Sequence, residues 1–233
     1  MDRLVQEIIA DLKSYLEYMR GMGITALPAS ESHTGRVSSP TLEEIRMELG
    51  DCRRCKLHRT RRTLVFGEGN KKAKLMIIGE GPGYEEDVQG KPFVGKAGQL
   101  LTKILQSIHL QREEVYITNI IKCRPPQNRN PEPDEIQSCY PFLLKQIHAI
   151  QPQIICALGT FSAHTLLKTD AKITTLRGRF YEFAGIKVLP TYHPAYLLRN
   201  PERKREVWED MKQIAKYMVS SDKPSQPVGE NSR

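Results

Sequence analysis

Four cysteines lie in two pairs far apart along the chain, and together they could bind a metal. Two residues separate Cys52 from Cys55, fifteen separate Cys123 from Cys139, and 67 residues lie between the pairs. Four thiolates can bind either zinc or an iron–sulfur cluster, and the spacing alone leaves this choice open. Such a site would join the basic segment around the first pair to a second polar segment, which contains Lys122, Arg124 and Asn128.

The expected location of the protein supports metal binding by these cysteines. The N-terminal residues include acidic side chains and no apolar run typical of a signal peptide, so we expect a cytoplasmic protein. Disulfides are uncommon in that reducing compartment, which leaves metal binding as the favoured use of paired cysteines. No apolar run approaches the roughly 20 residues of a membrane-spanning helix. The fifth cysteine, Cys156, lies in the apolar run IICAL and is expected in the core.

Other segments carry side chains that could act on a substrate. Residues 79–98 are rich in glycine and contain Phe93 and several carboxylates, but they match neither a dinucleotide-binding fingerprint nor a P-loop. Asn119 directly follows an apolar run, where its amide could offer a ligand one donor group and one acceptor. His193 precedes a proline at the end of another apolar run. These types of residue suit the binding and polarisation of a small polar group.

The elements that must position these residues alternate between strand and helix. Continuous apolar runs predict strands at 74–79, 115–118, 153–158 and 186–191, and amphipathic patterns predict helices at 97–109, 132–150, 160–168 and 201–218. This order is typical of a three-layer α/β/α fold with a central four-stranded parallel sheet. Ligands of such folds bind outside the carboxyl ends of the strands, so the polar segments after each strand should converge on one crevice. Trp208, in the last helix, is expected to be a core residue.

Four regions are predicted along the chain. Residues 1–24 contain an amphipathic helix, and residues 25–40 resemble a flexible linker. Thr41 and Glu44 form a capping box at the start of the main domain, which is expected to span 41–219. The polar tail at 220–233 is expected to be disordered.

The charge of the chain favours a polyanionic partner. The formal net charge is +8, and the segment 52–62 contains basic residues and no acidic one. We expect its cations to contact nucleic-acid phosphates, and these are Arg53, Arg54, Lys56, Arg59, Arg61 and Arg62. Tyr196 and Leu197 lie close to Arg199, and apolar side chains beside arginines can wedge into a base stack.

Taken in order, these motifs resemble those of the family 4 uracil-DNA glycosylases, the iron–sulfur members of the uracil-DNA glycosylase superfamily. The resemblance runs from about residue 43 to residue 218 and does not cover residues 1–40. The matching pieces are CRRC at 52–55, GEGPGYEED at 79–87, GKPFVGKAGQLL at 90–101, TNIIKCRPPQNRNP at 118–131, Cys139, and TYHPAYLLRNP at 191–201.

The resemblance implies a role for each motif. The four cysteines would hold a [4Fe–4S] cluster, with structural zinc as the alternative. The partner would be uracil-containing DNA, single- or double-stranded, from which the base must be flipped before it can be cleaved. Phe93 would stack on the uracil, Asn119 would bond its Watson–Crick edge, and His193 would donate toward its O2 atom, where negative charge develops.

One departure concerns the carboxylate that activates water. Family 1 enzymes have an aspartate where this chain has Gly81, which is placed among the substrate-binding residues. Glu80 and Glu86 are the nearby candidates to position water or stabilise a cationic sugar, and Glu80 ranks first. A tyrosine in this motif excludes thymine in some relatives, but that role is not assigned to Tyr84.

Two other functions stay open on the sequence. One is a glycosylase of the same fold that accepts other deaminated bases, although no arginine-rich insertion with a histidine follows the GKAG motif. The other is a non-catalytic, metal-stapled module that binds nucleic acid. We expect a monomer, whose N-terminal helix could dock on a repair or replication protein.

Overall fold

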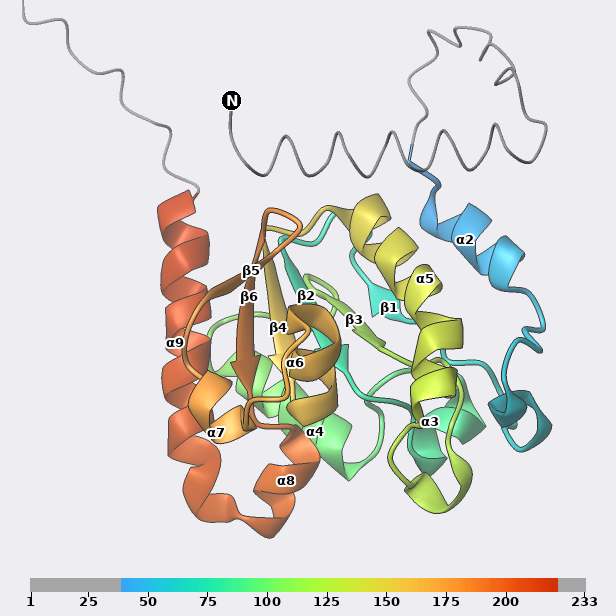
Figure 1. The fold of residues 1–233 in the computed structure, drawn as a ribbon. Helices are drawn as coiled ribbons and strands as arrows, with labels where there is room; N and C mark the ends of the chain where they lie inside the picture. The colour runs from blue at the N-terminus through green and yellow to red at the C-terminus, as the bar shows by residue number, and fades with distance from the viewer. Residues whose placement is uncertain (1–38, 222–233) are drawn as a thin grey trace, which may run out of the picture. The chain divides into compact units, whose positions relative to one another are not determined.

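A six-stranded sheet forms the centre of the protein in the computed structural model, which describes residues 39–221 (Figure 1). The strand order is β1-β3-β2-β4-β6-β5. The strands are β1 (Glu68–Gly69), β2 (Leu75–Gly79), β3 (Tyr116–Asn119), β4 (Ile154–Leu158), β5 (Tyr181–Phe183) and β6 (Ile186–Thr191). The helix predicted in 1–24, most of the linker predicted at 25–40 and most of the tail predicted at 220–233 lie outside the described residues.

The four central strands are parallel, as predicted, and the two edge strands are antiparallel to their neighbours. The sequence analysis missed both edge strands because β1 has two residues and β5 has three, too few for an apolar pattern. The register brings the strand ends level at one edge of the sheet. Gly79 pairs with Asn119 across β2 and β3, and Leu158 pairs with Thr191 across β4 and β6.

Eight α-helices surround the sheet within the described residues. They are α2 (Leu42–Leu49), α3 (Tyr84–Gln89), α4 (Lys96–Gln106), α5 (Pro133–Ile150), α6 (Thr160–Leu167), α7 (Ile173–Leu176), α8 (Pro194–Arg199) and α9 (Lys204–Ser221). The 3₁₀ turns are η1 (Lys56–Arg59), η2 (Pro126–Asn128) and η3 (Pro201–Arg203). The sequence analysis predicted the long helices but missed α3, α7 and α8, which have six, four and six residues. The predicted capping box at the start of α2 is present.

Both faces of the sheet are covered, which confirms the three-layer prediction. Alternate strand residues point to opposite faces, so Met76 and Ile78 pack in one core cluster and Leu75 and Ile77 in the other. The first cluster includes residues of α2, α5 and α6, and the second includes residues of α4, α8 and α9. Cys156 is fully buried in the second cluster, as predicted.

Two predictions about the last helix are wrong. Trp208 was expected in the core, but it is 46% exposed and lies under the ammonium group of Lys212. Helix α9 also extends to Ser221, past the predicted start of the tail, and the hydroxyl groups of Ser220 and Ser221 donate to the carbonyl of Tyr217. None of the helices within residues 39–221 is long and apolar enough to cross a membrane.

Candidate active site

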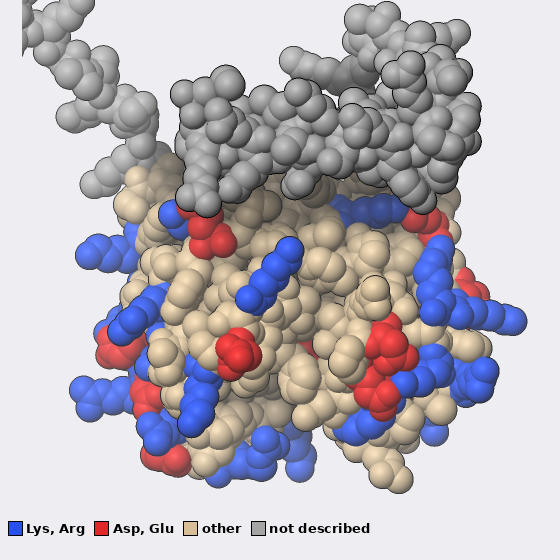
Figure 2. Space-filling model, viewed as in Figure 1, with Lys and Arg blue, Asp and Glu red and all other residues tan. Residues whose placement is uncertain are grey.

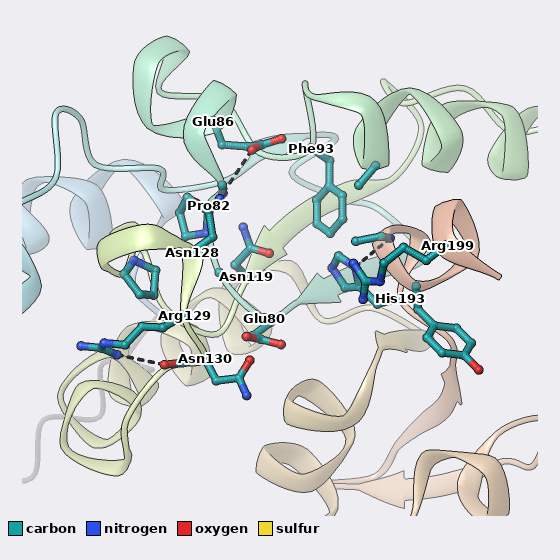
Figure 3. Close-up of a pocket in the computed structure, with 16 residues that line it drawn as sticks. Glu80, Pro82, Glu86, Phe93, Asn119, Asn128, Arg129, Asn130, His193 and Arg199 are labelled. Atoms are coloured by element: carbon teal, nitrogen blue, oxygen red, sulfur yellow. Dashed lines mark hydrogen bonds between the residues drawn. The ribbon is translucent and has the colours of Figure 1, made fainter.

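A cavity of about 420 Å³ lies at the carboxyl edge of the parallel strands (Figure 3). Its lining includes Glu80 after β2, Asn119 at the end of β3 and His193 after β6, as the sequence analysis predicted. Phe93 reaches the same cavity from the loop before α4. The segment after β4, Gly159 and Thr160, lines a second cavity of about 520 Å³ instead. The two cavities share Glu80, His193 and Tyr196.

Asn119 presents an unpaired acceptor at this cavity. Its side chain is only 1% exposed, and its Oδ1 atom is buried without a hydrogen-bond partner among the described residues. A Cβ atom at Gly79 would lie 2.4 Å from that oxygen and 2.5 Å from the Phe93 ring, so only glycine fits there. A buried acceptor without a partner is costly, and a ligand donor would satisfy it.

Phe93 is held in an unusual backbone conformation beside His193. Its φ angle is 53°, in the left-handed region, and its ring centroid lies 5.5 Å from that of His193. The Arg112 guanidinium donates from Nη1 to the Phe93 carbonyl at 2.9 Å and from Nη2 to the Pro92 carbonyl at 2.8 Å. A Cβ atom at Gly98 would lie 1.9 Å from the Phe93 carbonyl oxygen, so glycine lets the loop pack against α4.

His193 is fixed as a neutral hydrogen-bond donor. It is the N-cap of α8, and its Nδ1 atom accepts from the Ala195 amide at 3.1 Å. The neutral ring therefore carries its proton on Nε2. Burial, with a smaller contribution from the nearby Arg199, lowers the pKa of His193 to about 4, against a small opposing effect of Glu86. The imidazole is thus uncharged at neutral pH.

Glu80 lies between the two cavities and has a free carboxylate. Figure 3 places it between Asn119, His193 and Asn130. No hydrogen bond to its side-chain oxygens is made by another described residue. Burial raises the pKa of Glu80 to about 7, so the group exchanges its proton close to neutral pH.

Glu86, the second candidate to position water or stabilise a cationic sugar, has both carboxylate oxygens bound by backbone amides. Its Oε1 atom accepts from the amides of Val94 and Gly95, both at 2.9 Å, and its Oε2 atom accepts from the Gly83 amide at 3.1 Å. Three backbone donors bound to one carboxylate fasten the glycine-rich turn to the Phe93 loop. The contacts of Glu86 thus position the loop, and its role toward the substrate stays a prediction.

The backbone of Gly81 lines the cavity, and its position has no room for a side chain. A Cβ atom there would lie 2.8 and 2.9 Å from the Cγ1 and Cδ1 atoms of Ile121. An aspartate could not replace this glycine unless Ile121 moved. The lack of an aspartate at this position therefore has a steric reason, and the role of Glu80 in its place stays a prediction.

The four predicted metal ligands are brought together from distant parts of the chain. Cys123 is electrostatically influenced by Cys139 and Cys55, and Cys139 by Cys55 and Cys52. Burial raises the pKa of the thiols of Cys55, Cys123 and Cys139. Within the described residues, no three histidine, cysteine or acidic side chains lie close enough together to hold a single metal ion.

Hydrogen-bond donors surround these sulfurs. The Arg61 guanidinium lies 3.2 Å from Cys123 Sγ, that of Arg54 lies 3.4 Å from Cys52 Sγ, and the Lys122 amide lies 3.4 Å from Cys139 Sγ. Such donors stabilise thiolates that bind a cationic metal group. The donor set therefore fits a thiolate-bound metal group.

Comparison with known proteins identifies the family. The model of the uracil DNA glycosylase superfamily matches residues 66–212. The chain belongs to this superfamily. A type-4 uracil-DNA glycosylase from Saccharolobus solfataricus is 47% identical over 188 residues, which are 77% of this chain and 87% of that protein. Those from Archaeoglobus fulgidus and Thermotoga maritima are each 44% identical, and they cover 75% and 76% of this chain and 92% and 94% of their own lengths.

The predicted phosphate-binding run at 52–62 is only partly available to DNA. The Arg61 side chain is 6% exposed and donates to the Cys52 carbonyl and to Asp51, so its assignment as a phosphate ligand is wrong. Arg54 donates to two carbonyls of α2, and Lys56 pairs with Glu132 and Asp134 at the start of α5. In Figure 2, acidic side chains lie over that part of α5, close to the basic group over η1.

The other cations of the run are more exposed. Arg53 pairs with the exposed Asp51, whereas Arg59 and Arg62 form no ion pair within residues 39–221. Figure 2 also shows basic side chains gathered over α8 and η3, at the lower edge of the view. In this view, basic side chains thus lie on either side of the acidic start of α5, and others lie over α9.

The predicted wedge residues differ in exposure. Leu197 is fully buried in the core, so it cannot insert into DNA, and that prediction is wrong. The neighbouring Leu198 is 45% exposed on the same helix and is available instead. Tyr196 and Arg199 line the cavity as expected. The alternation arises because α8, which the sequence analysis missed, points Leu197 inward and Leu198 outward.

Several residues of the site were not predicted. Asn128, Arg129 and Asn130 line the cavity opposite Arg199, in a turn where Gln127 and Asn128 have positive φ angles (Figure 3). The asparagines in QNRN were a signal for such a turn, because asparagine tolerates this conformation. Arg112 had no local signal, because it acts on a loop 19 residues away.

Proposed function

We propose that this protein removes uracil from DNA by hydrolysing the N-glycosidic bond of deoxyuridine, the first step of base excision repair. The observation that carries the proposal is one cavity in which an unpaired amide oxygen and a neutral imidazole donor face an aromatic ring. The family and the relatives named type-4 uracil-DNA glycosylases support it.

Recognition of the base begins with its extrusion from the stack, since the glycosidic bond is not accessible inside a duplex. Phe93 would stack on the flipped ring. The Asn119 Oδ1 atom would accept from uracil N3–H, and its amide group would donate to O4. Cytosine presents an acceptor at N3 and a donor at C4, so an asparagine held in this orientation rejects it. The unpaired, buried Oδ1 atom supports this role.

Cleavage breaks the bond between the base N1 atom and the sugar C1′ atom, and the bonding electrons leave with the base. Negative charge grows on uracil O2, where the Nε2–H group of His193 would donate a hydrogen bond. A neutral imidazole donates without transferring a full proton, which suits a histidine with a pKa of about 4. Water then adds its oxygen to C1′, and its released proton balances the departing uracil anion.

Glu80 is the carboxylate that we propose to act on the sugar side. In its ionised form it would stabilise the positive charge that develops on the deoxyribose and orient the attacking water. Its lack of a hydrogen-bond partner among the described residues and its position between two cavities support this role. None of the described residues that line this cavity is a lysine, and we propose a monofunctional glycosylase.

We also propose that Cys52, Cys55, Cys123 and Cys139 bind a [4Fe–4S] cluster. When bound, this group would cross-link the segment before η1 to the segment between β3 and α5. Hydrolysis of a glycosidic bond transfers no electrons, so its role would be structural. Iron and acid-labile sulfide contents near four per chain would support the cluster, whereas a colourless protein with one zinc per chain, purified without oxygen, would support the alternative.

The activity test uses an oligonucleotide with one deoxyuridine, incubated with the purified full-length protein and then cleaved with alkali at abasic sites. We expect strand cleavage with uracil and none with cytosine or thymine at the same position. Parallel oligonucleotides with hypoxanthine or xanthine test the wider specificity. Tight binding without release of any base would contradict the proposal and favour a non-catalytic module.

A further inference from the structure

Three segments that are far apart in sequence meet at an exposed aromatic ring near the cavity. Tyr84, the first residue of α3, is 46% exposed. The guanidinium carbon of Arg62 lies 5.4 Å from the centroid of its ring, and that of Arg124 lies 5.2 Å away. Both guanidinium groups are therefore within cation–π distance of the same exposed ring.

Both guanidinium groups are available to an anion. Within residues 39–221, neither Arg62 nor Arg124 forms an ion pair, in contrast to Arg61 and Lys56. Arg124 donates from Nε to Asn128 Oδ1 at 2.7 Å, which orients its terminal nitrogens. Of the carboxylates nearest in sequence to Tyr84, Glu85 is exposed and forms no ion pair with Arg62 or Arg124. Glu86 is bound by backbone amides, and Asp87 is buried and accepts from the backbone amides of Arg62 and Thr63.

This group lies at the rim of the proposed uracil pocket. Gly83, next to Tyr84, and Asn128, bound to Arg124, both line that cavity. Figure 3 shows Asn128 and Pro82 on one side of Glu80 and His193 and Arg199 on the other. A DNA strand that places a base in the cavity would thus pass between Arg199 and the Arg62–Tyr84–Arg124 group.

We propose that Arg62, Tyr84 and Arg124 form a platform that binds phosphates of the strand that carries the uracil. The inference rests on the proposed function and adds Tyr84 and Arg124 to the DNA-binding surface. Guanidinium groups bind phosphate oxygens through paired N–H donors, and contacts of this kind fix the register of the strand. The platform and Arg199 together would hold the backbone on both sides of the flipped nucleotide.

The main test measures how affinity for DNA depends on salt. The probe is an oligonucleotide with one 2′-fluoro-2′-deoxyuridine, whose glycosidic bond resists cleavage because fluorine destabilises positive charge on the sugar. For Arg62→Gln and Arg124→Gln, we expect the slope of log Kd against log salt concentration to fall by about 0.7 on single strands and about 0.9 on duplex DNA. The double variant should lose about twice as much.

Lys212→Gln is the matched control, because Lys212 also lies over an exposed aromatic ring, that of Trp208, outside both cavities. Its slope should equal that of the unaltered protein. Tyr84→Phe should also keep the slope, since the ring alone holds the guanidinium groups, whereas Tyr84→Leu should weaken binding. Trp208 is as exposed as Tyr84, so Trp208→Leu controls for the loss of a surface aromatic.

The outcomes separate this proposal from the proposed function. Unchanged slopes in both arginine variants, with uracil release by the unaltered protein, would overturn the platform alone. Reduced slopes in a protein that releases no uracil would support the platform as a DNA contact and contradict the proposed function.

Discussion

The cysteine region and the proposed uracil pocket both contain buried polar groups. These groups are hydrogen-bonded within the protein around the cysteines and, within residues 39–221, lack a partner in the pocket. Around the cysteines the cations are paired. Lys122 is fully buried, and its ammonium group donates to Thr118 Oγ1, the Asn119 carbonyl and Gln146 Oε1, each at 2.7 Å. In the pocket, Asn119 Oδ1 is buried without a partner among the described residues, and burial alone shifts the pKa of the Glu80 carboxyl group. Satisfied polar groups stabilise one arrangement of the chain, and unsatisfied ones are kept for a ligand.

Asn119 connects the two regions. Asn119 offers its side chain to the pocket, while its carbonyl accepts from Lys122, the neighbour of Cys123 in the chain. Lys122, next to Cys123, thus holds the backbone at the end of β3, and the Asn119 side chain at the same position lines the pocket. Experiments that disturb one region without the other can test this division.

The largest expected effect on the rate of uracil release comes from removing a side chain that we propose to contact the base. Asn119→Ala and His193→Ala should each reduce kcat by about a hundredfold to a thousandfold, because each removes a contact to the base where charge develops. The measurement is single-turnover uracil release at saturating enzyme. Unchanged thermal unfolding would show that the fold is intact, and activity within a few-fold of the unaltered protein would contradict the assigned roles.

Replacement of Glu80 should have the next largest effect on the rate of uracil release and should change its pH dependence. Its pKa is raised to about 7 and its active form is the carboxylate, so the rate should fall as the pH drops through about 7. His193, with a pKa of about 4, stays neutral over this range. Glu80→Gln should lower the rate about a hundredfold at pH 8 and remove the inflection near pH 7. An inflection that persists in this variant would exclude Glu80 as its source.

The raised pKa of Glu80 also affects the stability of the fold, and this effect has the opposite pH dependence to that of the rate. A carboxyl group whose pKa is higher in the folded than in the unfolded protein favours folding in its protonated form. The contribution of Glu80 to the free energy of unfolding should therefore decrease as the pH rises from the usual glutamate range through about 7. Denaturant unfolding of the unaltered protein and of Glu80→Gln over this range would show the difference, and parallel curves would contradict it.

Variants of Arg112 test whether the Phe93 loop depends on hydrogen bonds from a residue that is distant in sequence. Arg112→Ala should reduce kcat/KM for uracil release by about tenfold, because the Phe93 loop loses the donor that holds its carbonyls. Arg112→Lys, which keeps the charge but cannot bond both carbonyls in the same way, should recover little. In a double-mutant cycle with Phe93→Ala the two losses should not add, whereas additive losses would indicate a role unrelated to Phe93.

The smallest expected effects compare two arginines of the same run. Arg61→Gln should destabilise the fold by about 1–3 kcal/mol, because it leaves buried acceptors near the cysteines without a donor, and the salt dependence of DNA binding should not change. Arg59→Gln, at an exposed position with no ion pair among residues 39–221, should leave stability unchanged and reduce the salt slope by less than one. The reverse pattern would show that the basic run is a continuous DNA-binding surface.

Much of the fold and the site could be predicted because the signals are local. Continuous apolar runs determine the four parallel strands, and parallel strands bring Glu80, Asn119 and His193 to one edge of the sheet. The short elements could not be predicted in this way. Helix α8 is six residues long, so nothing in the local pattern showed that Leu197 would point into the core and Leu198 to solvent.

The sequence by itself determined which chemical groups are available: four thiols, a glycine-rich acidic turn, and an asparagine and a histidine at strand ends. Only the tertiary structure decided which of these groups are already hydrogen-bonded within the protein and which are free to bind a ligand. Glu80 and Glu86 are both carboxylates in the same motif, yet one is free and the other is bound by three backbone amides. Arg61 and Arg62 are adjacent, yet one supports the cysteines and the other stacks on Tyr84. The reason is physical, because hydrogen bonding and burial depend on neighbours that are distant in the chain and close in space.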